Sequence, residues 1–461
     1  MKRFAIILAA GKGTRMKSKK YKVLHEVAHK PMVEHVLDHV SSAGFEKVIT
    51  IVGFGAEEVK KVLGSRTKFA LQEEQLGTGH AVLQAEQFLG REKGTTLVIC
   101  GDTPLISQEV LESLVQKHAE EGAKATILTA QTEHPFGYGR IIRDQDGLVQ
   151  KIVEEKDSTE EEKRVTEINT GTYVFDNESL FECLHQVGND NAQGEYYLPD
   201  VIGILQAQGE RIAAYQMEDF SASLGVNDRV ALAKANQLFY QRNNEKWMKA
   251  GVTLVDPSST YIDPEVVIGE DTVLEANVRL LGKTTIGPDC VIDAYSTIRD
   301  SQIGQGVVIQ SSQIEESQVG DYVTIGPMAH LRPKSKLEDY VHIGNFVEVK
   351  NATLGKHTKA GHLTYIGDAD LGEDINVSCG VIFCNYDGVQ KYRSQIGDHS
   401  FIGSNANLVA PVNVSDHSFI AAGSTITKDV PSKALALGRS KQVNKENYWD
   451  KLPISKNQSN S

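Results

Sequence analysis

Two hydrophobic periods divide this sequence into two halves. In the first half, up to about residue 227, short β-rich apolar runs alternate with longer segments of helical apolar spacing. Nearly continuous apolar runs are typical of strands buried on both faces of a parallel sheet, and they occupy residues 4–8, 47–52 and 96–100. Helical spacing occupies residues 32–43 and 108–119. This alternation predicts a Rossmann-like open α/β domain, whose ligands bind beyond the carboxyl ends of the strands.

The second period begins at Tyr261, where aliphatic residues start to recur at about every sixth position. A heptad or α-helical repeat cannot give this spacing, whereas a hexapeptide β-helix does. Each six residues would form one flat side of a triangular coil; the aliphatic residue fills the axis, and the small residue that often follows, as in Ile268-Gly269, turns the corner. The series comprises Ile262, Ile268, Leu274, Leu280, Ile286, Ile292, Ile298, Ile303, Ile309, Ile314, Val319, Ile325, Leu331, Leu337, Ile343 and Val349, and then Ile396, Ile402, Leu408, Val414, Ile420 and Ile426.

One polar-faced helical segment, residues 229–249, separates the two periods. We therefore expect a first domain over residues 1–229, a helical linker over 230–250 and a hexapeptide domain over 251–461. At roughly 100–200 residues per domain, the 461-residue chain is long enough for each domain to bury its own core.

Composition excludes several classes of protein. The chain carries 48 Lys and Arg against 61 Asp and Glu, and this net charge of −13 argues against nucleic-acid binding. The five cysteines include no Cys-x-x-Cys pair, so we expect a reducing, cytoplasmic compartment and neither a disulfide framework nor a zinc site. The apolar N-terminus leads directly into a glycine- and lysine-rich loop, and no apolar stretch reaches 18 residues, so we expect no signal peptide and no membrane span.

The C-terminal tail differs in charge from the rest of the chain. Residues 430–461 contain six Lys or Arg and two acidic residues, and they end in a run of Ser and Asn. Two interpretations stay open: a frayed polar terminus, and a basic arm that reaches an anionic ligand.

A glycine-rich loop follows the first predicted strand, with the sequence Gly11-Lys12-Gly13-Thr14-Arg15-Met16. Glycines let the backbone approach a phosphate, successive N–H groups form an anion-binding concavity, and Lys12 and Arg15 add positive charge. The loop lacks the third glycine of a dinucleotide-binding fingerprint and the Gly-Lys-Ser/Thr ending of a P-loop. It therefore predicts a phosphate site of another kind.

This loop resembles the opening signature of the sugar-1-phosphate nucleotidyltransferases, Leu-x-x-Gly-x-Gly-Thr-Arg-Met/Leu followed by a Lys. With the hexapeptide half attached, the chain is similar to the bacterial bifunctional family that uridylylates N-acetylglucosamine 1-phosphate and acetylates glucosamine 1-phosphate. The resemblance covers the chain up to its C-terminal tail. It implies UTP and acetyl-CoA as co-substrates, Mg²⁺ as cofactor, and UDP-N-acetylglucosamine, a precursor of bacterial cell-wall polymers, as product.

The same resemblance implies roles for residues of the first half. Arg15 and Lys22 would be catalytic, because they would neutralise the triphosphate and the leaving pyrophosphate. Asp102 and Asn227 would bind magnesium. The nucleotide would contact Leu8, Ala9, Ala10, Gly11, Lys22, Gln72, Gly77 and Thr78, and the acetamido sugar would contact Gly139, Glu154, Asn169 and Asn227. Cys100 and Asp228 depart mildly from the family pattern, and neither departure removes an oxygen ligand.

The chemistry explains these residue types independently. Attack of a sugar phosphate on the α-phosphate of UTP brings two anions together, so cations must stabilise the charge that builds up. Mg²⁺ prefers hard oxygen ligands and keeps waters, so a carboxylate, an amide oxygen and phosphate oxygens suffice. No covalent nucleophile is needed. The alternative role for Asp102 is to cap a turn before Pro104.

The hexapeptide rhythm breaks between Phe383 and Ile396, and loops that interrupt a solenoid often carry its chemistry. Acetyl transfer to an amine needs a base that works near neutral pH, a task that suits histidine. Only the resemblance singles out His362 as that base among 14 histidines. It also places the sugar phosphate at Arg332, Lys350, Tyr365 and Asn376, and acetyl-CoA at Cys379, Asn385, Tyr386, Ser404, Ala422 and Arg439.

Alternatives remain for some of these residues. The basic ones would otherwise be solvated surface charge, and Cys379 would otherwise be a packing residue, since direct transfer needs no acyl-enzyme. The resemblance further implies a left-handed β-helix, against the usual right-handed rule for parallel crossovers. It also implies a homotrimer with acetyl-CoA bound between subunits.

Three functions compete for this sequence. The first is the bifunctional enzyme, the second a nucleotidyltransferase whose β-helix is structural or regulatory, and the third a non-catalytic sugar-nucleotide-binding scaffold. The scaffold predicts lost charges at Lys22, Asp102 or Asn227, and the second function predicts a regular coil without His362 or the Asn385-Tyr386 insertion. All of these residues are present, which favours the bifunctional enzyme.

Overall fold

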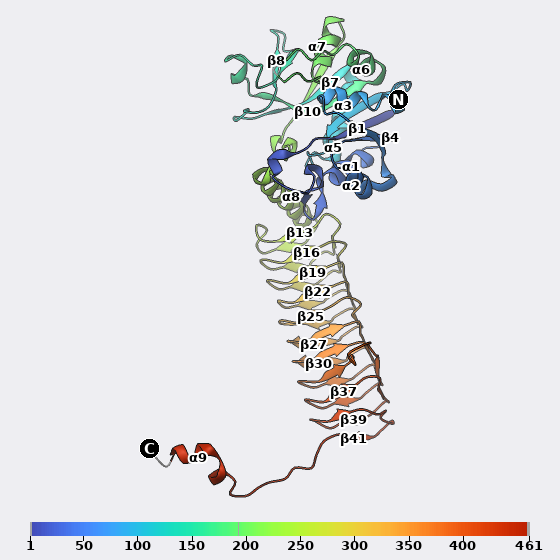
Figure 1. Ribbon diagram of the computed structural model, residues 1–461, viewed down its shortest axis with the longest axis vertical. Coiled ribbons are helices and arrows are strands. Elements are labelled where there is room, and N and C mark those ends of the chain that lie inside the picture. Colours follow the sequence, from blue (N-terminus) through green and yellow to red (C-terminus); the bar gives the residue numbers. More distant parts are fainter. Residues whose placement is uncertain (1, 192, 459–461) are drawn as a thin grey trace. The chain divides into compact units, whose positions relative to one another are not determined.

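A computed structural model describes residues 2–191 and 193–458 of the chain. It divides into two compact units, residues 1–242 and residues 243–461, each with its own fold (Figure 1). The first unit is an α/β fold around a twisted sheet, and the second is a stack of short parallel strands.

The sheet of the first unit contains the three predicted strands side by side. β1 (Arg3–Ala9) lies between β4 (Lys47–Val52) and β6 (Thr95–Cys100) and is parallel to both, as predicted. The whole sheet is mixed, however, because β10 (Glu167–Asp176) runs antiparallel to β6 and to β7. The remaining strands are β5 (Lys68–Leu71), β7 (Ala125–Gln131), β8 (Arg140–Arg143), β9 (Val149–Val153) and β11 (Ile212–Met217).

Helices cover both faces of this sheet and explain its apolar runs. In β1, Ala5 and Ile7 belong to one buried cluster, whereas Phe4 and Ile6 belong to a second one. Successive strand residues point to opposite faces, so a strand that is covered on both sides is apolar throughout. The helices are α1 (Met32–Ser42), α2 (Ala56–Leu63), α3 (Thr78–Leu83), α4 (Glu86–Leu89), α5 (Gln108–Glu121), α6 (Asn177–Leu184) and α7 (Asp200–Ala207).

The long helix α8 (Arg229–Lys249) coincides with the predicted polar-faced segment. Its last turns begin the second unit: Asn243 Nδ2 donates to Ile262 O at 2.7 Å, and Trp247 packs against the axial apolar cluster. The helix therefore caps the first coil of the stack. The domain boundaries proposed from the sequence stay a prediction.

The second unit is a parallel β-helix with three sheets. The first sheet has 11 strands from β12 (Thr253–Leu254) to β41 (Leu435–Ala436), the second has 10 from β13 (Tyr261–Ile262) to β40 (Thr425–Ile426), and the third has nine from β14 (Val267–Ile268) to β38 (Asn413–Val414). Each strand pairs in parallel with the equivalent strand of the next coil, so that Ile262 lies beside Leu280 and Leu280 beside Ile298. The aliphatic residues of the repeat are all buried in one axial cluster, which confirms the hexapeptide prediction.

The expectation that the small residue after each aliphatic turns the corner is wrong. Gly287 follows Ile286 without a positive φ, and a Cβ at this position would lie 2.6 Å from the Gly304 backbone of the next coil. Glycine is therefore needed for close approach between coils. The left-handed turn comes two residues later, as at Asp289 (φ 58°) and Phe346 (φ 58°).

The predicted break in the repeat is a loop. Residues 385–393 connect β34 (Ile382–Cys384) to β35 (Ser394–Ile396), and Tyr386 and Lys391 form an isolated antiparallel bridge at its base. Beyond β41 the chain leaves the coils, and the last element that the structure describes is the short helix α9 (Pro453–Gln458) (Figure 1).

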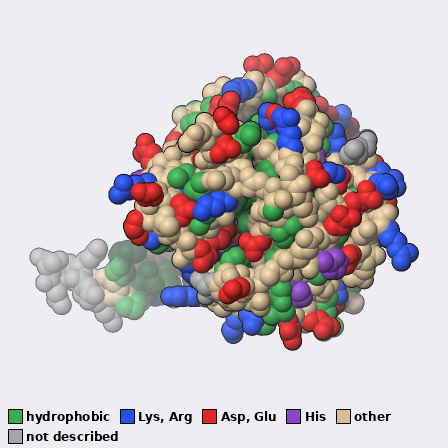
Figure 2. All heavy atoms as spheres, turned by 90° about the horizontal axis from the view of Figure 1, so that it is seen from above, with side chains coloured by type: hydrophobic (Ala, Val, Ile, Leu, Met, Phe, Trp, Pro, Cys, Tyr) green, Lys and Arg blue, Asp and Glu red, His purple; other side chains and the backbone are tan. Residues whose placement is uncertain are grey.

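The surface agrees with the charge analysis. Figure 2 shows acidic and basic side chains interspersed over one face of the molecule rather than gathered into a large basic patch. Across the described residues, none of the helices combines the length and the apolar composition that crossing a bilayer requires.

Candidate functional sites

The glycine-rich loop packs closely against a lysine. Gly13 has φ 62°, and a Cβ there would overlap the Lys22 side chain. Glycine at this position therefore serves both the left-handed backbone and the close approach of Lys22. Thr14–Met16 continues as a 3₁₀ turn that carries Arg15.

Four predicted residues form a charged cluster: Arg15, Lys22, Asp102 and Asn227. Lys22 Nζ donates to Asn227 Oδ1 at 2.7 Å and forms an ion pair with Asp102 Oδ2. Arg15 Nη2 donates to the same Asn227 oxygen at 2.9 Å. The side chains of Lys22 and Asp102 are only 17% and 15% exposed, so water screens their charges less than it would at the surface.

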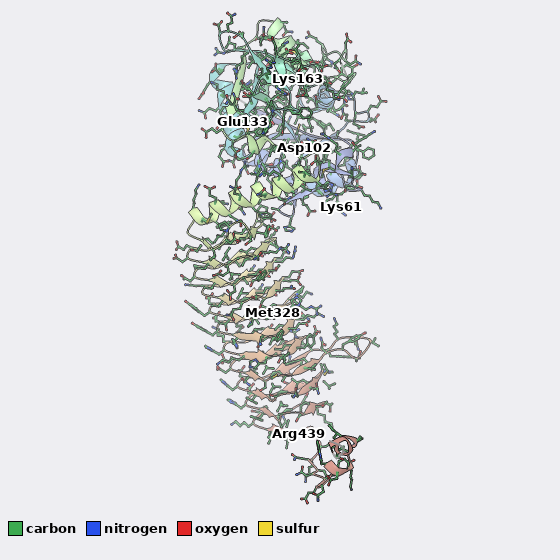
Figure 3. All side chains as sticks on the ribbon, turned by 90° about the vertical axis from the view of Figure 1, so that its left-hand side faces the viewer. Lys61, Asp102, Glu133, Lys163, Met328 and Arg439 are labelled. Atoms are coloured by element: carbon green, nitrogen blue, oxygen red, sulfur yellow. The ribbon has the colours of Figure 1, made fainter. Side chains whose placement is uncertain are left out.

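Three distant chain segments supply this cluster. Asp102 lies just beyond the end of β6, and its carbonyl accepts a hydrogen bond from Val226 N at 2.9 Å. This backbone bond sets residue 227 beside residue 102, across more than a hundred residues of sequence. The site therefore lies at the carboxyl end of a parallel strand, as the α/β pattern predicts. Figure 3 labels Asp102 within the first unit.

The two oxygens of this cluster could hold a cation. Asp102 Oδ2 and Asn227 Oδ1 both contact the single ammonium group of Lys22, so they converge on one positive charge. Among the described residues, no three His, Cys, Asp or Glu side chains form a metal-binding group. A hard ion that takes the rest of its oxygens from phosphates and water fits this pair.

A pocket of about 250 Å³ lies near the carboxyl ends of β1 and β6. Four of the predicted residues line it, namely Leu8, Thr78, Glu154 and Asn169. A fifth, Gly139, accepts a hydrogen bond from Asn169 N at 2.9 Å, so it adjoins the pocket wall. The structure thus gathers the predicted sugar-binding residues except Asn227, which lies in the charged cluster. Other lining residues include Cys100, Tyr173 and Tyr197.

Burial sets the protonation of groups around this pocket. Burial raises the pKa of Glu154, and the negative charges of Asp157 and Asp200 raise it further. Burial and then Asp102 raise the pKa of Cys100 to about 12, so this thiol is not a nucleophile at neutral pH. Burial also raises the pKa of Tyr138.

The predicted base-binding residues form a connected segment. Gln72 follows β5, is 3% exposed, and donates from Nε2 to Gly77 O at 3.2 Å. Gly77 has φ 113°, and a Cβ there would lie 2.8 Å from Tyr196 N, so only glycine fits. Thr78 begins α3, and its hydroxyl accepts a hydrogen bond from Leu198 N at 3.0 Å.

In the β-helix, His362 is exposed and lies at the end of β30 (Lys359–His362). Its Nδ1 is 3.1 Å from Oδ1 of Asn345, which occupies the same register position in the preceding coil. Because a carboxamide oxygen only accepts, this contact is a hydrogen bond in the tautomer that carries the proton on Nδ1, and in that tautomer Nε2 keeps its lone pair. The geometry provides a base that faces outward.

The predicted acetyl-CoA residues follow one edge of the β-helix. We call the turn from each first-sheet strand to the next second-sheet strand corner 1. Backbone hydrogen bonds link successive corners: Gly380 N donates to Leu363 O, Asn405 N to Cys379 O, and Gly423 N to Ser404 O. This ladder places four predicted residues in a row, namely His362, Cys379, Ser404 and Ala422. The row leads to Arg439, since Gly438 is hydrogen bonded to Thr425 and Ser424 at the last corner.

The predicted sugar-phosphate residues lie on the second sheet. Arg332 Nη1 donates to Glu348 Oε1 at 2.7 Å, which helps to raise the pKa of Arg332. The pKa of Lys350 is lowered, first by close contact with Lys391, then by burial and by nearby cations that include Arg332. Lys350 and Lys391 are adjacent cations whose repulsion the nearby Asp368 offsets only in part, so they form a site that attracts phosphate.

Tyr365 and Asn385 complete this face of the second sheet. Asn385 is buried, and its Nδ2 donates to Tyr365 Oη at 3.3 Å and also to Asp368. The Tyr365 ring passes so close over Gly367 that a Cβ there would lie 2.5 Å from its Cζ atom. Tyr386, in contrast, is 59% exposed on the inserted loop.

Asn376 does not join these residues within one chain. It begins β33 (Asn376–Val377) on the first sheet and points outward there, beside Lys359 of the preceding coil. Arg332, Lys350 and Tyr365 lie on or next to the second sheet. One copy of the chain therefore leaves Asn376 on a different face.

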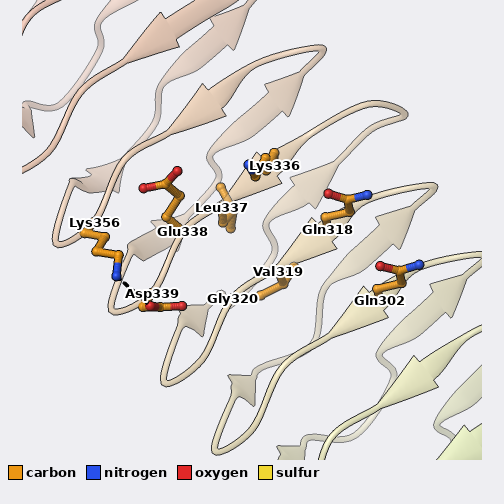
Figure 4. Close-up of a pocket in the computed structure, with 9 residues that line it drawn as sticks. All are labelled: Gln302, Gln318, Val319, Gly320, Lys336, Leu337, Glu338, Asp339 and Lys356. Atoms are coloured by element: carbon orange, nitrogen blue, oxygen red, sulfur yellow. Dashed lines mark ion pairs between the residues drawn. The ribbon is translucent and has the colours of Figure 1, made fainter.

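A larger pocket, of about 350 Å³, lies elsewhere on the β-helix. It is a groove on the third sheet, where Gln302, Gln318 and Lys336 are neighbours in consecutive coils and Lys356 pairs with Asp339 (Figure 4). None of the residues predicted for either site lines it.

Sequence reasoning missed two residues of these sites and one contact of a residue that it did identify. Lys391 lies in the inserted loop that the broken repeat reveals, so a basic residue within that loop was a usable signal. Asn345 precedes His362 by 17 residues, about one coil, so coil arithmetic could have paired them. Gly13 gave no sign of its contact with Lys22, because that approach depends on how the loop folds back.

Comparisons with known proteins agree with this architecture. The nucleotidyl transferase family model matches residues 4–252, a model of six bacterial transferase hexapeptide repeats matches residues 265–300, and the hexapeptide repeat of succinyl-transferase matches residues 395–428. These repeats accord with the left-handed parallel β-helix expected for the second unit.

Curated relatives match nearly the whole chain. A bifunctional protein GlmU from Enterococcus faecalis is 61% identical over 98% of this chain and 99% of its own length. One from Listeria monocytogenes is 59% identical over 99% of this chain and 100% of its length. One from Halalkalibacterium halodurans is 57% identical over 97% of this chain and 99% of its length.

Proposed function

This chain belongs to the family of bifunctional GlmU proteins. From that premise we propose which of its residues serve each of two transfer reactions. The enzyme is both an acetyltransferase and a nucleotidyltransferase. One reaction moves the acetyl group of acetyl-CoA to the amine of glucosamine 1-phosphate and releases CoA. The other moves UMP from UTP to N-acetylglucosamine 1-phosphate and releases pyrophosphate, giving UDP-N-acetylglucosamine.

We assign uridylyl transfer to the charged cluster and the neighbouring pocket. Gln72 and Gly77 would bind the uracil, and the pocket with Glu154 and Asn169 would bind the acetamido sugar. Its phosphate then attacks the α-phosphorus of UTP, and Arg15 and Lys22 stabilise the charge that builds on the phosphate oxygens and the leaving pyrophosphate. Because Lys22 is preorganised and partly buried, it acts more strongly than it would in water; Arg15 is exposed.

Asp102 and Asn227 are the residues that would hold Mg²⁺. Their convergence on the Lys22 ammonium supports this, because a cation already occupies the position between the two oxygens. When bound there, the ion supplies additional positive charge to the triphosphate. Arg15 and Lys22 remain the protein's own contribution to the phosphates.

We assign acetyl transfer to His362. The Asn345 contact keeps the proton on Nδ1, so Nε2 is free to take a proton from the sugar amine as the nitrogen attacks the thioester. Arg332, Lys350 and Lys391 would bind the phosphate of the sugar. The corner 1 row, from Cys379 to Arg439, would carry acetyl-CoA.

We propose that three copies of the chain assemble along corner 1. Large apolar side chains are exposed at four of five consecutive turns of this corner: Tyr295 by 72%, Met328 by 59%, Phe346 by 58% and Leu363 by 60%, with Ser311 at the turn between the first two. Figure 3 labels Met328 on the β-helix. An exposed apolar row of this kind favours a protein interface, and a second copy could bring its Asn376 to the sugar. Sedimentation equilibrium of the full chain tests the trimer.

A cytoplasmic location likewise remains a proposal, supported only by the free state of all five cysteines.

The observation that carries the assignment is the separation of the two residue sets. Every residue assigned to uridylyl transfer lies within residues 1–242, and every residue assigned to acetyl transfer lies within residues 243–461. A substitution in one unit should therefore abolish one reaction and leave the other intact.

A pair of variants tests this separation. His362→Ala should lower the acetylation rate about 10²–10⁴-fold, the usual contribution of a general base, and leave uridylyl transfer within about twofold of wild type. Asp102→Ala should lower uridylyl transfer about 10²–10³-fold, with an altered Mg²⁺ titration, and leave acetylation intact. Equal loss of both activities in either variant would contradict the assignment, and an unchanged Mg²⁺ titration would remove Asp102 from the metal site.

A further inference from the structure

The amide of Gln72 has a defined orientation. Its Nε2 lies 3.2 Å from Gly77 O, an atom that can only accept a hydrogen bond, so the nitrogen end of the amide must face Gly77. The same nitrogen is 3.1 Å from Nδ1 of His80. Both amide hydrogens of Gln72 therefore have acceptors, and the carbonyl oxygen Oε1 is the end that remains for a ligand.

His80 can accept this bond only in one tautomer. A donating Gln72 nitrogen requires an unprotonated Nδ1, which puts the ring proton on Nε2. On that side Nε2 lies 3.2 Å from Nε2 of Gln84, whose amide also donates to His80 O at 3.0 Å. The half-buried Gln84 amide can turn its oxygen to the ring proton, at the loss of its bond to His80 O, whereas Gln72 is 3% exposed and its nitrogen is fixed by Gly77 O. The proton thus belongs on the Gln84 side.

Uracil and cytosine differ at the atom such an amide would read. Uracil presents an N3–H donor, whereas cytosine presents a lone pair at N3 and an amino group at C4. A fixed Gln72 Oε1 accepts from uracil N3–H and repels the cytosine lone pair, and a polar site built for one pattern rejects the other strongly.

We propose that His80 is a positioning residue that locks the Gln72 amide, and that this lock makes the nucleotide site select UTP over CTP. The inference rests on the proposed uridylyl transfer, in which Gln72 binds the base. His80 itself touches neither substrate in this account and acts only through Gln72. Without it, one buried amide hydrogen loses its acceptor, and only the bond to Gly77 O still holds the amide in this orientation.

The surroundings of His80 permit a clean substitution. Its ring lines a pocket of about 290 Å³, together with Leu76, Leu83 and Leu184. A leucine at position 80 fits among these apolar side chains and removes the acceptor. An asparagine can place an oxygen near the position of Nδ1 and restores it. Gln84→Leu removes only the other neighbour of the ring and is the matched control.

Steady-state uridylyl transfer with UTP and with CTP tests the proposal. For His80→Leu we expect the KM for UTP to rise about tenfold, with kcat and the KM for N-acetylglucosamine 1-phosphate nearly unchanged, and the UTP-to-CTP ratio of kcat/KM to fall about tenfold. His80→Asn should recover most of that ratio, and Gln84→Leu should keep it. Adding His80→Leu to Gln72→Ala should change the ratio no further, because the two residues act as one unit.

Two results would overturn the proposal. One is a wild-type UTP-to-CTP ratio in His80→Leu, whether or not kcat or the melting temperature falls. The other is an additive effect of the two substitutions in the double variant. Failure of the proposed function would look different, because the wild-type enzyme itself would then not use UTP.

Discussion

Individual residues owe their roles here to the one or two atoms they contact. Lys22 illustrates this, because its ammonium joins a carboxylate and an amide oxygen in a partly buried cluster while its aliphatic carbons lie against Gly13 of the glycine-rich loop. His362 and His80 are further cases, in which one neighbouring amide decides which ring nitrogen keeps its lone pair. Chemistry at both proposed sites thus depends on hydrogen-bond partners as much as on residue type.

Binding of glucosamine 1-phosphate should be coupled to proton uptake at Lys350. Lys391, burial and Arg332 lower the pKa of Lys350 in the free enzyme. A bound phosphate stabilises the charged amine and raises this pKa. At a pH between the pKa of Lys350 in the free enzyme and its pKa in the complex, the complex holds a proton that the free enzyme lacks. Binding therefore takes up protons and weakens as pH rises.

Calorimetry in buffers of different ionisation enthalpy measures this uptake. Lys391→Met removes the largest cause of the lowered pKa, so the uptake should shrink. Lys356→Met, on another face of the β-helix, is the control and should leave the uptake unchanged. Equal uptake in the wild type and in Lys391→Met would show that Lys350 is not the group that titrates.

At the scale of residues, the sequence predicts which residue types form the sites, but it predicts poorly which neighbouring residues they contact. The glycine loop, Asp102 and Asn227 were identified from motifs, and the structure brings them together. Lys391, Asn345 and His80 were not identified, since each depends on register between coils or on how a loop packs. The family resemblance groups Asn376 with residues that lie on another face of the same chain.

At the scale of elements, periodicity determines most of the fold. A six-residue aliphatic repeat can be satisfied only when all its members share one axis, and the structure buries them in a single cluster. Likewise the continuous apolar runs become strands covered on both faces. The sequence does not predict that β10 is antiparallel, because nothing local in its sequence sets its direction. Its pairing with β6 and β7 sets that direction.

Two neighbouring glycines test the close contact between coils. A Cβ at Gly344 would overlap the carbonyl oxygen of Gly361 in the next coil, whereas a Cβ at Gly361 would meet nothing within 4 Å. Gly344→Ala should therefore destabilise the β-helix by about 1–3 kcal/mol, the usual cost of overpacking. Gly361→Ala should change stability by less than about 0.5 kcal/mol.

Differential scanning calorimetry of the full chain reads this difference as a shift in melting temperature. The pair is matched, because both glycines belong to the first sheet, lie in adjacent coils and have no positive φ. If both variants had the melting temperature of the wild type, the close approach of the coils would not be what requires glycine at position 344.

At the scale of the whole molecule, two units with separate cores each contain one complete set of proposed residues. The product of one unit is the substrate of the other, since acetylation of the amine yields the sugar phosphate that is then uridylylated. The sequence revealed this division through its change of period near residue 261. It could not reveal the partners of each site, which depend on folding.

The most direct test is a single reaction that requires both units. The purified full-length protein is mixed with glucosamine 1-phosphate, isotope-labelled acetyl-CoA, UTP and Mg²⁺, and the products are analysed by mass spectrometry. We predict UDP-N-acetylglucosamine that carries the labelled acetyl group, together with CoA and pyrophosphate. If no labelled product forms while added N-acetylglucosamine 1-phosphate is still uridylylated, the β-helix does not acetylate this sugar, and the account of a two-step synthesis by one chain is contradicted.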